Sequence, residues 1–301
     1  ERFEFLDVTG ADEYHERVNN DAYTNYMIRL TAKAALDVLD LLKRDYPDRY
    51  EELMAELDYR DEEEHIRDLY ENIYLPEPGA GLVIEQFDGY LKGVDLSLEE
   101  LYSRIIKPNE YLGSPTGLTV NTQIIKQADV VLLMSLLGDA FTEKVKEKNW
   151  EYYEPRTEHG SSLSTCIYAL LAAQVGKTEW AYKYLMKAAK IDLTGDYKLY
   201  LGDLYIGGTH PAANGGTWMV VVQGFAGLDV KDGGIRIDPH LPDKWEELKF
   251  CFGYAGSRYR AAVRRREIEI RCESPESAEL KVTCRGKEYL CTPDESLKIT
   301  Y

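Results

Sequence analysis

The sequence predicts a mainly α-helical chain that ends in a β domain. Apolar residues recur at steps of three and four residues through most of the first 226 positions, which is typical of helices with one buried face. From about residue 230 the apolar period falls to two, which indicates short strands. With 301 residues, 44% of them hydrophobic, the chain can form one large or two ordinary domains with sizeable cores.

The helical part divides into segments separated by Gly, Pro and polar turns. Asn121 and Gly138 are suitable caps for a helix between them. Gly176 separates two further helices, which would form an antiparallel αα-hairpin. The predicted helices span residues 22–44, 48–57, 61–73, 122–137, 139–148, 162–175, 178–192 and 214–226.

No stretch of the chain repeats at a fixed period, so a repeat solenoid has no support. Helix pairs can instead close into a ring around a central cavity. The 23 tyrosines and four tryptophans would suit a cavity that stacks on the faces of sugars, although most aromatic side chains in any protein belong to the core.

The tail is predicted to form a small β-sandwich. Residues 267–270 alternate polar and apolar side chains, as a half-buried strand should, and Asp232-Gly233-Gly234 and Arg285-Gly286-Lys287 are turn signals. Several short strands at this spacing favour a sandwich. The predicted strands span residues 234–238, 248–252, 259–263, 267–272, 280–284, 289–292 and 296–300.

Composition and charge exclude several classes of protein. A net charge of -17 argues against nucleic acid as a partner, because phosphate backbones require a basic face. No run approaches the roughly 18 apolar residues of a membrane span, and the N-terminus lacks the apolar core of a signal peptide, so we expect a cytoplasmic protein. Five cysteines without metal-type spacing predict buried thiols, and the five histidines show no paired-ligand pattern. We therefore expect no metal and no cofactor.

A possible general acid lies near the start of the chain. Asp12 and Glu13 follow Gly10 in a turn beside aromatic and amide side chains. Cleavage of a glycosidic bond needs a carboxylic acid that protonates the leaving oxygen. The alternative is that both are ordinary acids in the first turn of a helix, and the residues alone favour this second interpretation.

Lys126 and Gln127 stand out within the apolar segment that is predicted as a helix. A cation and an amide side by side could bind sugar hydroxyls or an anion. They could equally lie on the polar stripe of that helix, and the residues alone leave both readings open.

Two loops with Gly and His precede predicted helices. His159-Gly160-Ser161-Ser162 places a histidine and two hydroxyls at a helix start, where unpaired N–H groups and a partial positive charge attract anions. The second loop, residues 207–216, contains His210 and several glycines that permit a ligand to approach the backbone. A simple helix cap and a simple turn are the alternatives.

Together these segments resemble the disaccharide phosphorylases of glycoside hydrolase family 65, which act on α-glucosides such as maltose, kojibiose, nigerose and trehalose. Four separated motifs occur in the family's order, and the similarity continues through the tail. The chain has Ala11 where the family usually has proline, which weakens the rigidity of the loop but leaves the acid in place. The matching segments are residues 9–25, 122–133, 156–164, 207–227 and 233–242.

The resemblance implies a role for each matching residue. Glu13 would be the general acid of an inverting phosphorolysis, in which phosphate attacks C1 and β-glucose 1-phosphate and glucose are released. The substrate-binding residues would be Lys126, Gln127 and Glu158. The residues that bind phosphate, the co-substrate, would be His159, Gly160, Ser161, Ser162 and His210.

The resemblance also implies an architecture and partners. Residues 1–228 would form the second half of an (α/α)6 catalytic barrel, and residues 229–301 the C-terminal β-sandwich. The first half of the barrel would belong to a preceding part of the same protein, and a homodimer is possible. Two alternatives stay open: an inverting α-glucoside hydrolase with Glu158 as the base, and a non-catalytic carbohydrate-binding fragment.

Overall fold

The computed structural model describes most of the chain, which forms two compact units. The described residues are 2–57, 62–113, 116–194, 200–201, 203–231, 233–274, 279–293 and 295–301, so Asp61 and Asp232 of the predicted helix and turn lie outside them. The first unit comprises Glu1–His159 with Leu201–Leu204, and the second Gly160–Tyr200 with Tyr205–Tyr301. The predicted division at residue 228 stays a prediction.

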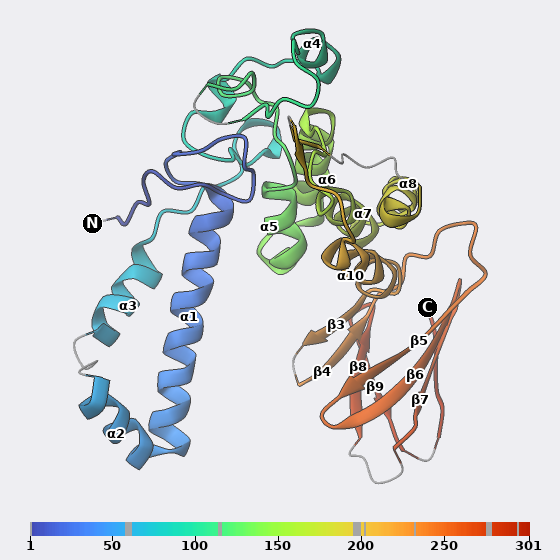
Figure 1. Cartoon of the computed structure of the whole chain (residues 1–301). Helices are drawn as coiled ribbons and strands as arrows, with labels where there is room; N and C mark the ends of the chain where they lie inside the picture. The colour runs from blue at the N-terminus through green and yellow to red at the C-terminus, as the bar shows by residue number, and fades with distance from the viewer. Residues whose placement is uncertain are drawn as a thin grey trace. The chain divides into compact units, whose positions relative to one another are not determined.

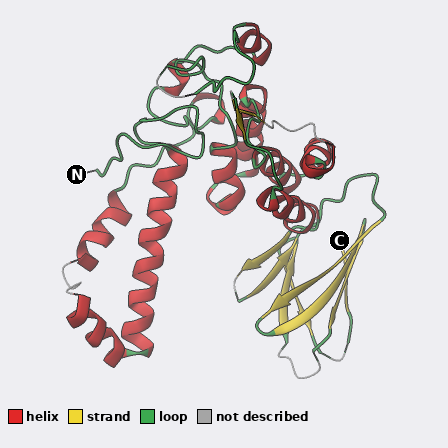
Figure 2. Ribbon diagram, viewed as in Figure 1, coloured by secondary structure: helices red, strands yellow, loops and turns green. Residues whose placement is uncertain are grey.

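The first unit is built around one long helix and an extensive set of loops. Asp21 begins α1, because its side chain accepts a hydrogen bond from the N–H of Thr24. Helices α2 and α3 lie alongside α1 (Figure 1). Figure 2 shows that much of the rest of this unit is loop. The helices are α1 (Ala22–Asp45), α2 (Pro47–Leu57), α3 (Glu62–Asn72), α4 (Leu98–Ser103), α5 (Val130–Leu136) and α6 (Glu143–Tyr153), with short 3₁₀ turns at Ala80–Leu82, Tyr90–Lys92, Gly138–Ala140 and Glu154–Arg156.

The prediction of one helix over residues 122–137 is wrong, because only Val130–Leu136 is helical. Ile125 instead pairs with Thr157 in a β-bridge, and the N–H of Lys126 donates to the carboxylate of Asp12 at 2.8 Å. The backbone amides of this segment therefore find partners in distant parts of the chain, which removes the need for helical hydrogen bonds.

The second unit opens with helices packed on α7. This helix is buried almost all round, and α8 follows it after Gly176, which takes a left-handed φ of 74°. Gly216 of α10 allows close approach to α7, since a Cβ there would lie 2.4 Å from Sγ of Cys166. The helical elements are α7 (Ser164–Gln174), α8 (Thr178–Ala188), α9 (Ile191–Thr194), α10 (Pro211–Met219) and a π-helical turn over Val220–Phe225. The short strands β1 (Tyr200–Leu201) and β2 (Leu204–Tyr205) each have one residue in either unit.

The C-terminal region is a sandwich of two four-stranded sheets. One sheet has the order β3-β4-β8-β9, in which β4 and β8 are parallel, and the other has the antiparallel order β10-β7-β6-β5. Inward-facing side chains of both sheets share one core, as the period of two predicts. The strands are β3 (Leu228–Lys231), β4 (Gly234–Ile237), β5 (Glu247–Tyr254), β6 (Ser257–Arg264), β7 (Glu267–Cys272), β8 (Leu280–Cys284), β9 (Lys287–Cys291) and β10 (Leu297–Thr300).

The helical region followed by C-terminal sheets is the fold class that the sequence predicts. Of the cysteines in the tail, Cys272, Cys284 and Cys291 are buried thiols, whereas Cys251 is exposed. Within the described ranges, no helix combines the length and the apolar character needed to cross a bilayer.

Candidate active site

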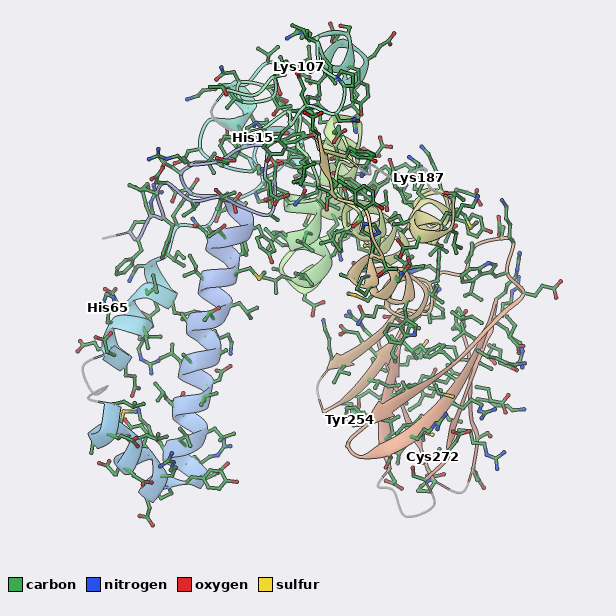
Figure 3. All side chains as sticks on the ribbon, viewed as in Figure 1. His15, His65, Lys107, Lys187, Tyr254 and Cys272 are labelled. Carbon is green, nitrogen blue, oxygen red and sulfur yellow. The ribbon has the colours of Figure 1, made fainter. Side chains whose placement is uncertain are left out.

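The loop that precedes α1 is held in place by the buried carboxylate of Asp12. Its Oδ1 accepts hydrogen bonds from the N–H groups of Tyr14 (3.1 Å) and Lys126 (2.8 Å). Its Oδ2 lies 2.6 Å from Nδ1 of His15 and accepts from Nε2 of Gln86 at 3.2 Å. Figure 3 shows His15 among the loops close to the start of α1. One buried acid therefore joins three segments that lie far apart in the sequence.

Two more buried acids, Asp129 and Asp21, lie next to this loop. The N–H of Asp12 donates to Oδ2 of Asp129 at 3.0 Å. Gly10 permits Asp129 and Asp21 to approach, since a Cβ on Gly10 would lie 2.2 Å from Oδ2 of Asp21 and 2.7 Å from Oδ2 of Asp129. Burial raises the pKa of Asp21 to about 6, and burial followed by the charge of Asp21 raises the pKa of Asp129 well above its usual range.

The fixed loop presents Glu13 to Lys126. The Lys126 ammonium forms an ion pair with Oε2 of Glu13, although the two residues are 113 positions apart. The side chain of Glu13 remains 52% exposed, so its carboxyl group is accessible to a ligand. The Tyr111 hydroxyl donates to the Glu13 carbonyl at 2.6 Å, and the Tyr111 ring centroid lies 5.6 Å from Nζ of Lys126.

Gln127 is anchored to the same loop. Its Nε2 donates to the carbonyl of Ala11 at 2.7 Å. Its Oε1 is buried and has no hydrogen-bond partner among the residues that the structure describes. An amide oxygen in this state can accept a hydrogen bond from a ligand hydroxyl.

Glu158 lies next to this group. Its N–H donates to the carbonyl of Ile125 at 2.9 Å, which places it beside Lys126. Its Oε2 accepts a hydrogen bond from the Tyr14 hydroxyl at 2.9 Å. Burial and then the Glu158 charge raise the pKa of Tyr14, and the same two causes raise the pKa of Tyr102 to about 12. The first unit thus gathers the predicted residues Glu13, Lys126, Gln127 and Glu158 in one place.

The predicted phosphate residues flank two helix starts. His159 ends the first unit with a left-handed φ of 56°. In the second unit, Gly160, Ser161 and Ser162 form the turn before α7, where Ser161 Oγ accepts from the N–H of Leu163 at 3.3 Å. The helix begins at Ser164, two residues later than predicted, and neither serine caps it, because Leu163 occupies the N-cap position without a side-chain hydrogen bond.

His210 occupies the N-cap position of α10. Asp192 contacts both the backbone N–H of His210, at 2.9 Å, and its Nδ1, at 2.6 Å. These hydrogen bonds, first the one from the backbone and then the one from the ring, lower the pKa of Asp192 to about 2.

The sequence did not single out Asp21, Asp129 or Asp192 as site residues, and it gave Asp12 only as one of a pair. Acids beside apolar residues or in a short polar turn give no local signal of burial. The one available hint is Asp129, a charged residue that follows Lys126-Gln127 and precedes an apolar run.

Profiles of known families match nearly the whole chain. Residues 1–219 match the glycosyl hydrolase family 65 central catalytic domain, and residues 228–291 match the glycosyl hydrolase family 65 C-terminal domain. The chain belongs to glycosyl hydrolase family 65. The resemblance inferred from four short motifs is therefore confirmed.

Relatives of this family-65 chain include proteins named as phosphorylases. The chain is 42% identical over 271 residues to a nigerose phosphorylase of Lachnoclostridium phytofermentans, and the aligned region covers 90% of the chain and 36% of the relative. It is 40% identical over 289 residues to a 1,2-α-glucosylglycerol phosphorylase of Bacillus selenitireducens, and the aligned region covers 95% of the chain and 38% of the relative.

A solved structure has the same fold. It is that of a kojibiose phosphorylase candidate from the human microbiome, with a TM-score of 0.81 and 25% identity, and the match covers all of this chain and 38% of that one. The chain thus spans somewhat more than a third of the length of these relatives.

Proposed function

We propose that this chain carries the acid and phosphate sites of an inverting disaccharide phosphorylase. The substrate is an α-linked glucose disaccharide, and the products are β-glucose 1-phosphate and glucose. The observation that carries the proposal is the group formed by the half-exposed carboxyl of Glu13 with Lys126, Gln127 and Glu158. The names of the relatives, which are phosphorylases, support the same reaction.

Glu13 supplies the proton. Its loop is fixed by Asp12, so the carboxyl position is set by buried contacts while the carboxyl group stays accessible. Glu13 protonates the interglycosidic oxygen as the bond from C1 to that oxygen breaks, and solvent then returns a proton to Glu13. General-acid catalysis of this kind contributes about 10²–10⁴-fold. Lys126, Gln127 and Glu158 bind sugar hydroxyls beside it.

Phosphate is the nucleophile and co-substrate, so no protein base is needed to activate water. His159, Gly160, Ser161, Ser162 and His210 bind and orient it through N–H groups, hydroxyls and imidazole nitrogens, and charge-assisted hydrogen bonds of this type are stronger than neutral ones. A phosphate oxygen forms the new bond to C1 on the face opposite the leaving group, which inverts the configuration.

The finer architecture belongs to the same proposal. Residues 1–228 form the second half of an (α/α)6 barrel, residues 229–301 form the C-terminal β-sandwich, and a preceding part of the protein supplies the other half of the barrel. We further propose that the whole protein is cytoplasmic and forms a homodimer.

Two tyrosine hydroxyls contact Glu158, the residue that would activate water in the alternative hydrolase. The Tyr14 hydroxyl donates to its carboxylate, and a further side-chain hydrogen bond links Tyr102 to Glu158. These two donors occupy about two of the four lone-pair positions of the carboxylate, so the phosphate dependence of the reaction decides between the two functions.

The test uses the full-length enzyme with a panel of α-linked glucose disaccharides, with and without phosphate. We expect glucose 1-phosphate to form only when phosphate is present, and the reactive sugar identifies the linkage. Equal release of glucose without phosphate would contradict the proposal. Glu13→Gln, with Glu16→Gln as the matched control, assigns any activity to the site.

A further inference from the structure

In the second unit, Asp192 and His210 make more contacts with each other than are needed to cap a helix. Asp192 lies in α9 and His210 precedes α10, and their side chains are 18% and 13% exposed. The two oxygens of one carboxylate have separate partners. Oδ1 contacts Nδ1 of the ring at 2.6 Å, while Oδ2 accepts from the His210 N–H at 2.9 Å and from Nδ2 of Asn214 at 2.9 Å.

These contacts fix both the position and the proton of the imidazole. A carboxylate accepts hydrogen bonds, so its contact with Nδ1 requires that Nδ1 carry a proton. The contact from Oδ2 to the backbone of the same residue ties the carboxylate plane to the main chain, which restricts rotation of the ring. Because the pKa of Asp192 is lowered to about 2, the group is ionised at physiological pH.

We propose that Asp192 is a positioning residue of the phosphate site, which orients the His210 ring and keeps the proton on Nδ1. In the proposed function, the other ring nitrogen, Nε2, contacts phosphate. It accepts from a phosphate hydroxyl when the imidazole is neutral and donates to a phosphate oxygen when it is protonated. This inference rests on the proposed function, since it takes His210 as a phosphate ligand.

A purely structural role for Asp192 would be to hold the start of α10. The contact with Asn214 belongs to that role, because Asn214 lies within the helix. The two roles differ in what they predict for the ring: a cap has no effect on the tautomer of His210, whereas a positioning residue determines it.

The kinetic test uses Asp192→Asn in the full-length enzyme, alone and combined with His210→Ala, and measures KM for phosphate and for the disaccharide. We expect Asp192→Asn to raise the phosphate KM about tenfold, equivalent to about 1.4 kcal/mol, with little change in the disaccharide KM. In the His210→Ala background the same substitution should add nothing, because it acts through the ring. Asn214→Ala, the control, should leave the phosphate KM unchanged.

The spectroscopic test does not depend on activity. In protein labelled with ¹⁵N-histidine, the His210 signals are assigned by their loss in His210→Ala, and their shifts report which ring nitrogen is protonated. We expect Nδ1–H in the wild type and a shift towards Nε2–H in Asp192→Asn. An unchanged tautomer, or additive effects in the double variant, would overturn the positioning role. An unchanged phosphate KM in His210→Ala would instead overturn the phosphate role of His210 in the proposed function.

Discussion

The proposed acid site in the first unit and the proposed phosphate residues in the second are built in different ways. Glu13 is positioned by side chains from distant segments, because the buried carboxylate of Asp12 joins its loop to Gln86 and Lys126. The turn before α7 and the start of α10 depend mainly on contacts within 18 residues in the sequence. The position of Glu13 therefore depends on long-range hydrogen bonds to a buried carboxylate, whereas the positions of the proposed phosphate residues depend on local turns and helix starts.

The largest effect should come from Glu13 itself. Glu13→Gln removes the transferable proton, so kcat for the disaccharide should fall about 10²–10⁴-fold. The phosphate KM should change little, because the phosphate residues other than His159 belong to the second unit. Steady-state kinetics with Glu16→Gln as control measures both. A large rise in phosphate KM with unchanged kcat would break the distinction between the two sites.

A smaller effect is expected at Gly10, where the acid site depends on close approach. Gly10→Ala would place a Cβ 2.2 Å from the buried Asp21 carboxylate, so the free energy of unfolding should fall by about 1–3 kcal/mol. Gly215→Ala in α10 is the matched control, because among the described residues no atom outside its chain neighbours and its own helix backbone lies within 4 Å of its Cβ position, and it should be neutral or slightly stabilising. Urea denaturation compares the two, and equal losses would contradict the account.

The buried acids should also make stability depend on pH. The folded pKa of Asp21, about 6, exceeds the ordinary value of 3.8, so its protonated form stabilises the fold at low pH and this contribution is lost as pH rises through about 6. Asp129→Asn removes the second buried acid whose pKa is raised, while keeping an oxygen that can accept from the N–H of Asp12. We expect this variant to lose less stability than the wild type between pH 4 and pH 7, as measured by urea denaturation. Parallel curves would contradict the raised pKa of Asp129 in the folded protein.

The smallest effect should come from the hydroxyl on Glu158. Tyr14→Phe removes the 2.9 Å hydrogen bond but keeps the buried ring. A hydrogen bond to a charged group is worth about 1.5–3 kcal/mol. The contact between Tyr14 and Glu158 is only partly buried, so we expect the lower value. The disaccharide KM should therefore rise by about tenfold or less, with the phosphate KM unchanged. Equal changes in both constants would indicate a general disturbance of the fold.

Local sequence pattern predicted most helices and the strands β4–β10, because apolar residues recur in most of them with the period of a helix or a strand. It failed at residues 122–137, where the amide of Lys126 is bound by Asp12 and a β-bridge at Ile125 replaces a helical turn. Strand β3 and the π-helical end of the last predicted helix were also missed. In residues 122–137 the hydrogen bonds to distant segments determine the backbone conformation, and a local apolar period cannot predict such contacts.

The candidate site shows the same limit. The residues alone made Glu13 and Lys126 candidates with open alternatives, and their roles, like the selection of Glu158, came from the family resemblance, because an ion pair across 113 residues leaves no trace in spacing. Asp129 and Asp192 were missed altogether, since their importance arises from burial and from hydrogen bonds that form only in the folded chain.

The most direct measurement of the central claim compares two substrates in the Glu13→Gln variant of the full-length enzyme. One is the natural disaccharide, whose leaving group needs a proton, and the other is α-glucosyl fluoride, whose leaving group needs far less assistance. If Glu13 is the general acid, the variant loses most turnover of the disaccharide but retains phosphate-dependent turnover of the fluoride. An equal loss with both substrates would contradict the account, because it would show that Glu13 does something other than donate the proton.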